Sequence, residues 1–527
     1  MKRWGLLALV FTIAISCTKK EEKAEFGLDL KETIRVNFLT EPPSLDWEKS
    51  TDTTSAFIQT NLMDGLAEYD FDSPELSVKP ALAESWEASN NATKWVIKLR
   101  QGVMWNDGVE LVAQHVVDGW ERLLRPTTAS EYAYYLFAVN GARDYNSGKI
   151  KDFSKVGVKA LDKYTLEVNL DSPRSYFPKM LTHHCTHPIR LDVIAKHGED
   201  TWADEGKIVT LGAYNLKKWD HDRIIHLERN ETYYGEKAKI KNVLVYMILE
   251  QSTAVGLMDT GKLDFQYEVP KANIRALQKR DDYISIPIFG TYYYGFNHTR
   301  APFNNIHLRK AVAQAIDTKE IETVINGAGK STSNLIPPGL LGYDPSIPNP
   351  FNIESAKSEL AAAGYGPEKP FKFTLSFNTN ENHQLIGENV QAQLKKNIGA
   401  LMELKNEEWK VYLKTLLAKD FDLYRLGWIS DYPDPNDFAS LMLSYSENNR
   451  GKYNNPKYDA LVEKAASELD EQKRAELYRQ AQNVLLKEDA GIVMIYSYVN
   501  AMLVSKRVKN FPVNSMYQFP LKGASLD

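Results

Sequence analysis

Short stretches of alternating apolar and polar residues recur along the whole chain, and they constrain its fold more than any other feature. In Lys94–Arg100, the side chains of Trp95, Ile97 and Leu99 would share one face of a strand, with charged side chains on the other face. Thr165–Leu170 repeats this alternation. We therefore expect half-buried strands that lie against a hydrophobic core.

Helical patterns separate these strands. Asn305 is placed to cap a helix that follows it, and the helical stretch Ser355–Ala363 runs up to Gly364, a residue type that often ends helices. Pro456–Glu488 has the apolar spacing of two consecutive helices. Strands and helices that alternate in this way predict an α/β protein with mixed sheets.

Length and charge narrow the possibilities further. A single hydrophobic core stops growing near about 250–300 residues, so a chain of 527 residues should form about three structural units. The 64 basic and 69 acidic side chains give a net charge of −5. Because nucleic-acid binding needs a basic face, this balance argues against a nucleic-acid partner.

The N-terminus has the pattern of an export signal. Met1–Arg3 carries positive charge, and Trp4–Ile15 is apolar but too short to span a bilayer. We therefore expect a signal peptide over residues 1–16. Export would place the protein in the periplasm or on the periplasmic face of a membrane.

A cysteine follows this signal directly. Ala14–Cys17 resembles a bacterial lipobox, with alanine where leucine is usual. The resemblance implies cleavage before Cys17 and attachment of a lipid to its thiol, with residues 17–25 as a polar tether. Cys185, the other cysteine, is then left without a partner, so no structural disulfide is expected.

Four longer segments carry a resemblance to a known family. They stand in the family's order, at Leu39–Asp46, Leu82–Gly108, Gly290–Asn305 and Arg425–Pro435. The segments resemble the peptide-binding lipoproteins of ABC importers (family 5 of the extracellular solute-binding proteins, peptide/nickel-binding group), and in particular the oligopeptide-binding proteins. The resemblance implies a substrate-binding protein that captures short peptides in extended form and delivers them to the transmembrane subunits of an ABC permease.

The family's fold is a two-lobed clamp of α/β lobes with mixed sheets, and an additional domain is inserted in lobe I. The resemblance places lobe I at 26–63, 188–289 and 499–527, the additional domain at 64–187, and lobe II at 290–498. Bridging strands would act as the hinge between the lobes. The resemblance also implies a lipid-anchored monomer that needs no cofactor or metal and catalyses no reaction.

Asp431 is the leading candidate for a ligand-binding residue. It follows the apolar strand Phe421–Trp428, and such strand ends point into the crevice of an α/β lobe. A buried carboxylate needs a cation, which the α-ammonium of a peptide supplies. The resemblance places the family's ammonium-binding aspartate at this position. The competing interpretation is that Asp431 only caps the turn after the strand.

Arg425 and His383 are the candidates for the other end of the peptide. The resemblance implies that both can meet the terminal carboxylate of the ligand, which a planar guanidinium suits well. Because Arg425 lies within an apolar strand, a structural ion pair is the competing interpretation. His383 precedes a predicted helix, and a histidine on a loop is otherwise usually just solvated.

Aromatic residues and one polar segment complete the expected site. The positions that match pocket aromatics of the family are Trp409, Trp428, Tyr132 and Tyr293. Such side chains also fill ordinary cores. Thr51, Asp52 and Thr53 match the segment that pairs with the backbone of an extended peptide. Thr51 and Leu416 depart from the family, which has an acidic and a basic residue at these two positions.

Other functions stay open. Three histidines lie close together around Cys185 in the sequence: His183, His184 and His187. They could bind a metal or serve a metal-dependent hydrolase. Because their spacing matches no established zinc motif, we favour a structural role. A dedicated binder of dipeptides, murein peptides or a metal chelate is a further alternative. A surface protein for adhesion or sensing is another.

Overall fold

The computed structural model describes residues 23–71, 73 and 76–527. The expected signal peptide and Cys17 lie outside the described residues. Within these ranges, no helix is long and apolar enough to cross a membrane.

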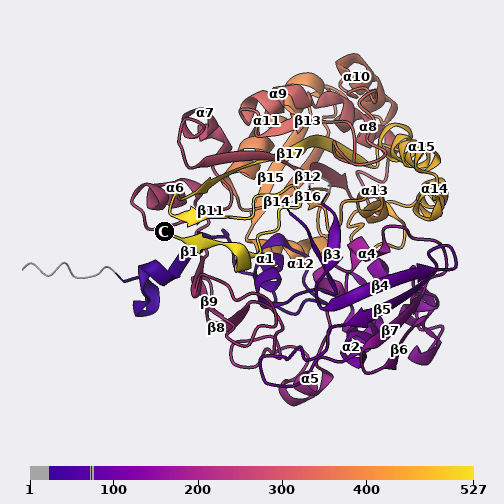
Figure 1. Ribbon diagram of the computed structural model, residues 1–527. Helices are drawn as coiled ribbons and strands as arrows, with labels where there is room; N and C mark the ends of the chain where they lie inside the picture. The colour runs from indigo at the N-terminus through magenta and orange to yellow at the C-terminus, as the bar shows by residue number, and fades with distance from the viewer. Residues whose placement is uncertain (1–22, 72, 74–75) are drawn as a thin grey trace, which may run out of the picture.

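One large mixed sheet passes through the molecule (Figure 1). Its strands are β1 (Thr33–Asn37), β8 (Tyr214–Asp220), β9 (Ile224–Arg229), β10 (Asn242–Tyr246), β11 (Phe265–Gln266), β12 (Tyr283–Phe296), β13 (Gly329–Ser331), β14 (Lys372–Asn378), β15 (Leu401–Glu407), β16 (Leu423–Ile429) and β17 (Ile492–Val504). Their order is β15-β14-β16-β12-β17-β11-β1-β10-β9-β8, and β13 pairs with β17. β1 runs parallel to β10 and β11, whereas β12 runs antiparallel to β16 and β17, so the sheet is mixed, as the sequence predicts.

Three smaller sheets accompany it. Their strands are β2 (Ala67–Tyr69), β3 (Val78–Pro80), β4 (Ala83–Ser89), β5 (Lys94–Leu99), β6 (Val158–Asp162), β7 (Thr165–Asn169), β18 (Val508–Lys509) and β19 (Ser525–Leu526). The order β4-β5-β7-β6 forms an antiparallel sheet at the lower right of Figure 1. Trp95, Ile97 and Leu99 of β5 are buried, which confirms the alternation expected there.

Helices cover the sheets. They are α1 (Thr53–Leu62), α2 (Ala113–Leu124), α3 (Ala142–Asn146), α4 (Phe177–Met180), α5 (Leu191–His197), α6 (Gln251–Asp259), α7 (Ile274–Leu277), α8 (Ile306–Ala315), α9 (Thr318–Val324), α10 (Ile353–Ala362), α11 (Glu381–Ile398), α12 (Trp409–Ala418), α13 (Pro435–Ala439), α14 (Pro456–Ser467) and α15 (Glu471–Gln482). Asn305 caps α8 by accepting a hydrogen bond from the His307 backbone N–H at 2.9 Å. Gly364 lies just beyond α10 with φ +79°, which glycine adopts without strain. These two signals, and the pair α14 and α15, confirm the sequence-based expectations.

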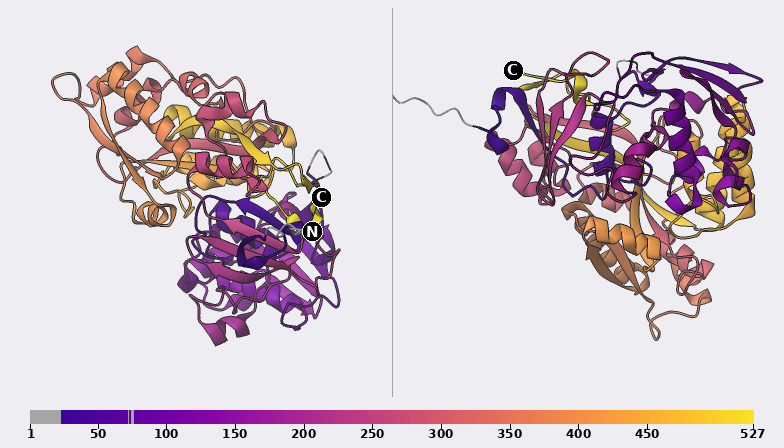
Figure 2. Two further views of the ribbon diagram at one scale, coloured as in Figure 1. Left: turned by 90° about the vertical axis from the view of Figure 1, so that its left-hand side faces the viewer. Right: turned by 90° about the horizontal axis from the view of Figure 1, so that it is seen from below.

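β12 and β17 connect two bodies of the molecule. The left view of Figure 2 shows one body mainly in indigo and magenta and the other mainly in orange and yellow. The register between the two strands shifts between Pro287 and Thr291 and again between Tyr292 and Tyr293. The lobe boundaries expected at 289/290 and 498/499 fall within these strands. We expect the hinge at this irregular pairing, because it interrupts the ladder where the chain crosses between the bodies.

Candidate functional site

A cavity of about 460 Å³ lies between the two bodies. Segments that are far apart in sequence line it, among them the start of α1, the end of β16 and the first turn of α11. Of the ten predicted ligand-binding residues, nine line this cavity: Thr51, Asp52, Thr53, Tyr132, His383, Trp409, Arg425, Trp428 and Asp431. The structure therefore brings together almost the whole predicted set.

Asp431 stands in the loop between β16 and α13, and neighbouring residues fix its backbone. The Asp431 backbone N–H donates to Asp437 Oδ2 at 3.0 Å, and Trp428 Nε1 donates to the same oxygen at 3.1 Å. The cap of α13 is Asp434, which accepts from the Asn436 backbone N–H at 2.9 Å. Turn capping is therefore performed by Asp434 and does not explain Asp431.

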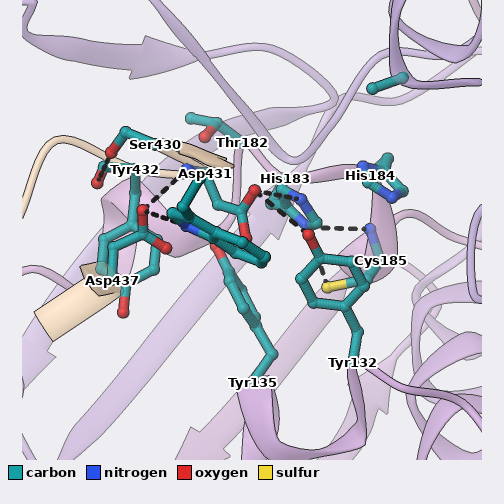
Figure 3. A network of polar contacts seen from close by, with 12 residues as sticks. Tyr132, Tyr135, Thr182, His183, His184, Cys185, Ser430, Asp431, Tyr432 and Asp437 are labelled. Atoms are coloured by element: carbon teal, nitrogen blue, oxygen red, sulfur yellow. Dashed lines mark hydrogen bonds and ion pairs between the residues drawn. The ribbon is translucent and has the colours of Figure 1, made fainter. Parts of the chain in front are cut away.

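The Asp431 carboxylate is satisfied on one oxygen only (Figure 3). Tyr132 OH donates to Oδ1 at 3.3 Å, and His183 Nε2 lies 3.2 Å from the same atom. His183 Nδ1 accepts from the Cys185 backbone N–H at 3.3 Å, which puts the ring proton of a neutral His183 on Nε2. Oδ2 is buried and has no hydrogen-bond partner among the described residues.

Burial sets the charge states here. It raises the pKa of Asp431 to about 8 and lowers the pKa of His183 to about 3. The contact between them at pH 7 is therefore a neutral hydrogen bond. Burial and the nearby Asp431 also raise the pKa of Asp437 well above its usual range. Among the described residues, no cationic side chain is paired with either of these two buried carboxyl groups, so an ammonium group would complete the site.

Arg425 is the cationic counterpart of Asp431 and, like it, has a buried polar atom without a hydrogen-bond partner among the described residues. It is buried, and its guanidinium donates to Asn378 Oδ1 at 3.2 Å and to Tyr498 OH at 2.8 Å. It also lies over the ring of Tyr292, 4.4 Å from the ring centroid. No ion pair between Arg425 and a carboxylate is found among the described residues, and Arg425 Nε has no partner among them. The structural ion pair considered for Arg425 is thus not present there, and a ligand carboxylate would fill its place.

His383 differs from the expectation in its setting. It lies in the first turn of α11, not before the helix, and it is buried. Asn380 caps this helix by accepting from the backbone N–H groups of Asn382 and His383. Burial, with Arg425 and Lys271 nearby, lowers the pKa of His383 well below its usual range, so the ring is neutral.

Lys271 is a residue of this region that the sequence reasoning missed. It is buried, its Nζ donates to the Ala328 carbonyl at 3.0 Å, and burial lowers its pKa to about 8. A single lysine outside any motif gives no signal in the sequence. Asp437 was missed as well, although it belongs to the same acidic stretch as Asp431.

Tyr293 corrects the predicted set. It is fully buried in β12 and does not line the cavity. Its ring packs against the ring of Tyr424, with the two ring centroids 6.3 Å apart.

Asp52 lines the cavity, but its carboxylate is already used. It caps α1 by accepting from the backbone N–H groups of Thr54 and Ser55 at 3.1 and 3.0 Å, and from Ser55 Oγ at 2.6 Å. The Trp409 side chain also hydrogen-bonds to it. The segment from Thr51 to Thr53 is not a strand in the structure, and backbone pairing with a ligand stays a prediction.

The histidine cluster does not converge on a point. His184 Nε2 lies 3.2 Å from the Ser50 carbonyl, whereas His183 points to Asp431. The described residues contain no group of three or more histidine, cysteine or acidic side chains that could hold a metal. The arrangement expected of a metal-dependent hydrolase is therefore not assembled there.

A series of contacts runs from Cys185 through His183 to Asp431, in the order of the nucleophile, base and acid of a thiol hydrolase. Cys185 Sγ lies 3.1 Å from His183 Nδ1. The Cys185 side chain is a free thiol with no exposed surface, and it does not line the cavity. Burial raises its pKa well above the usual range, so the thiol stays protonated. This cysteine is not built as a nucleophile.

Comparison with known proteins agrees with the geometry. The profile of the "Bacterial extracellular solute-binding proteins, family 5 Middle" matches residues 77–450. The chain is 34% identical over 530 residues to the periplasmic oligopeptide-binding protein OppA of Salmonella typhimurium, a match that covers 97% of this chain and 96% of the relative.

Two solved structures bear on the arrangement of the bodies. The Haemophilus influenzae OppA complex with RPPGFSPFR is similar with a TM-score of 0.90 at 31% identity, covering 94% of this chain and 99% of that chain. The unliganded open form of MppA, a periplasmic murein tripeptide binding protein, gives a TM-score of 0.64 at 30% identity, covering 94% and 98%. The two bodies of this chain are therefore arranged as in the peptide complex and not as in the open form.

Proposed function

Because this chain belongs to family 5 of the bacterial extracellular solute-binding proteins, we propose that it captures short peptides in extended form between its two lobes and delivers them to an ABC importer. Its relatives include oligopeptide-binding proteins that cover nearly the whole length of the chain. The chemistry of the cavity supports the same ligand class.

The unpartnered Asp431 Oδ2 carries this proposal. The atom is buried beside two neutral donors that both bind the other oxygen. A peptide α-ammonium offers three N–H donors and a full positive charge, which would stabilise the ionised carboxylate. With a neutral ligand, the buried carboxyl group of Asp431 would stay protonated.

Arg425 supports a zwitterionic ligand. It lines the same cavity as Asp431, and it stands in the middle of β16, whereas Asp431 lies beyond the end of that strand. A peptide that is short and extended would present its ammonium and its carboxylate to these two residues. Main-chain contacts along the cavity would then bind peptides of varied sequence.

The remaining parts of the proposal concern the cell envelope. We infer that the signal sequence directs export, that Cys17 carries a lipid anchor, and that the protein works as a monomer that presents its closed form to the transmembrane subunits of the permease. The lipobox-like Ala14–Cys17 supports the anchor. No bond is made or broken in this function, and the protected thiol of Cys185 agrees with that.

Binding of defined peptides tests the proposal. The purified protein is first examined by native mass spectrometry for co-purified peptides, then stripped by unfolding and refolding, and titrated by calorimetry with di- to pentapeptides. We expect co-purified peptides and measurable binding of at least one length class. A correctly refolded protein that binds none of these peptides would overturn the proposal.

A further inference from the structure

Arg450 lies in the loop that leads to α14, and it lines the cavity although no sequence pattern singles it out. Its side chain is 6% exposed. A guanidinium so far from water needs acceptors for its five N–H hydrogens. The partners of Arg450 therefore indicate whether the group is complete without a ligand.

Arg450 has partners on one nitrogen only. Nη2 donates to Asn448 Oδ1 at 3.0 Å and forms an ion pair with Glu131. Nε and Nη1 are buried and have no hydrogen-bond partner in the described part of the chain. Three of the five N–H hydrogens thus lack an acceptor among these residues.

Arg122 shows what a completed buried guanidinium looks like in this protein. It is fully buried, and all three of its nitrogens donate to carboxylates at distances of 2.5 to 3.1 Å. The carboxylates belong to Asp46, Glu48 and Glu199. One guanidinium can therefore bind more than one carboxylate in this protein. Arg450 has only Glu131, and its Nε and Nη1 groups could still donate to a second carboxylate.

A chain of contacts connects Arg450 to the part of the cavity near Asp431. Asn448, the neighbour of Arg450, donates to Tyr134 OH at 3.3 Å. The rings of Tyr134 and Tyr132 stack with centroids 6.1 Å apart, and Tyr132 donates to Asp431. A peptide held by its ammonium at Asp431 would place the side chains of its first residues in this region.

We propose that Arg450 forms a subsite for an acidic side chain, Asp or Glu, at one of the first two residues of the bound peptide. This inference rests on the proposed function and adds a side-chain preference to it. A carboxylate would supply acceptors for Nε and Nη1 with charge-assisted hydrogen bonds, which an amide of the same shape makes more weakly. Glu131 then acts as an internal competitor, because it already neutralises part of the guanidinium charge.

Matched peptides test the subsite. Calorimetry compares Glu-Ala-Ala with Gln-Ala-Ala and Ala-Glu-Ala with Ala-Gln-Ala, and Ala-Ala-Ala serves as the reference. At one of the two positions, the wild type should bind the glutamate peptide about tenfold or more tightly than the glutamine peptide. Arg450→Gln should reduce this ratio to within about threefold, with the affinity of each peptide expressed relative to that of Ala-Ala-Ala for the same variant.

Two further variants separate the subsite from a purely structural ion pair. Glu131→Gln removes the competitor and should increase the glutamate preference. Arg450→Gln combined with Glu131→Gln leaves no unpaired buried charge, so it keeps the test valid if Arg450→Gln alone folds poorly. Arg143→Gln breaks another ion pair, the exposed one to Glu463 at 3.4 Å, outside the cavity, and should keep the preference.

The outcomes are distinct. If Ala-Ala-Ala binds but glutamate and glutamine peptides bind equally well at both positions, the subsite is wrong and the proposed function stands. The same conclusion follows if the glutamate preference persists in the double variant. If no tripeptide binds to the folded wild type, both the subsite and the tripeptide part of the proposed function are wrong.

Discussion

His183 Nε2 and Asp431 Oδ1 lie 3.2 Å apart, and both residues line the cavity. Tyr132 adds a second contact to the same oxygen. In the expected division of the chain, Tyr132 and His183 lie in the additional domain and Asp431 lies in lobe II, so we expect both contacts to Asp431 Oδ1 to form only when the lobes are closed. Opening would expose the carboxylate to water, so the protonation of Asp431 should be coupled to the closure of the two lobes.

Closure of the ligand-free protein should depend on pH through Asp431. Its pKa is about 8 in the closed cavity because of burial, whereas a solvated aspartate has a pKa of about 3.9. The closed state binds the extra proton, so this contribution to closure is fully present below pH ~4 and is lost as the pH rises to ~8. Asp431→Asn is neutral at every pH and should close more readily without a ligand.

A fluorescence pair on the two lobes of the stripped protein measures this effect. The closed-to-open ratio of Asp431→Asn relative to wild type should grow about tenfold between pH 7 and pH 8.5. His183 has a pKa of about 3 and stays neutral over this pH range, and Lys271 is present in both proteins, so its contribution cancels in the comparison. A relative ratio that stays constant over this range would contradict the coupling.

Asp434→Asn should destabilise the fold through a buried ion pair. Arg474 donates to both carboxylate oxygens of Asp434 at 2.9 and 2.6 Å, and the two side chains are 8% and 6% exposed. Asparagine still caps α13, but it leaves the Arg474 charge unpaired, which commonly costs about 3–5 kcal/mol. Urea unfolding should show a loss of that order.

Glu463→Gln is the matched control for this variant. Its partner Arg143 lies 3.4 Å away, and both side chains are 49% exposed. Exposed pairs contribute about 0–1 kcal/mol, so the midpoint of unfolding should barely move. Equal losses in the two variants would show that burial of the pair is not the cause.

Cys17→Ser should abolish lipidation. The thioether to the lipid requires the thiol, so the variant should accumulate as a longer precursor without fatty acid. Metabolic labelling with a fatty-acid analogue, followed by fractionation of the cells, measures both properties. Labelling of Cys17→Ser at the wild-type level would show that the anchor is elsewhere or absent.

Local signals in the sequence predicted much of the fold. The alternation in Lys94–Arg100 and the cap at Asn305 act over a few residues, and the structure confirms both. Asn380 gives a similar cap signal, which would have placed His383 inside α11. The resemblance to the family supplied the long-range arrangement that no local pattern contains.

The details of the site depend on contacts that sequence alone does not reveal. The sequence does not show that Tyr293 is fully buried and that its ring packs against the ring of Tyr424. The missing partners of Arg450 become visible only once its surroundings are packed. In the same way, Asp434 and not Asp431 caps α13, which distinguishes two aspartates that look alike in the sequence.

The most direct test of the central claim is a four-corner calorimetric cycle on Asp431 and the peptide α-ammonium. Wild type and Asp431→Asn are each titrated with a free tripeptide and with its N-acetylated form. Removal of one partner of a desolvated pair commonly costs about 2–5 kcal/mol, which is roughly 30- to several-thousand-fold in affinity.

Because the two changes remove one shared interaction, their losses should not add, and the coupling energy should be well above ~0.5 kcal/mol. A coupling energy within ~0.5 kcal/mol of zero, in a protein that binds the free tripeptide, would contradict the assignment of Asp431 as the ammonium site.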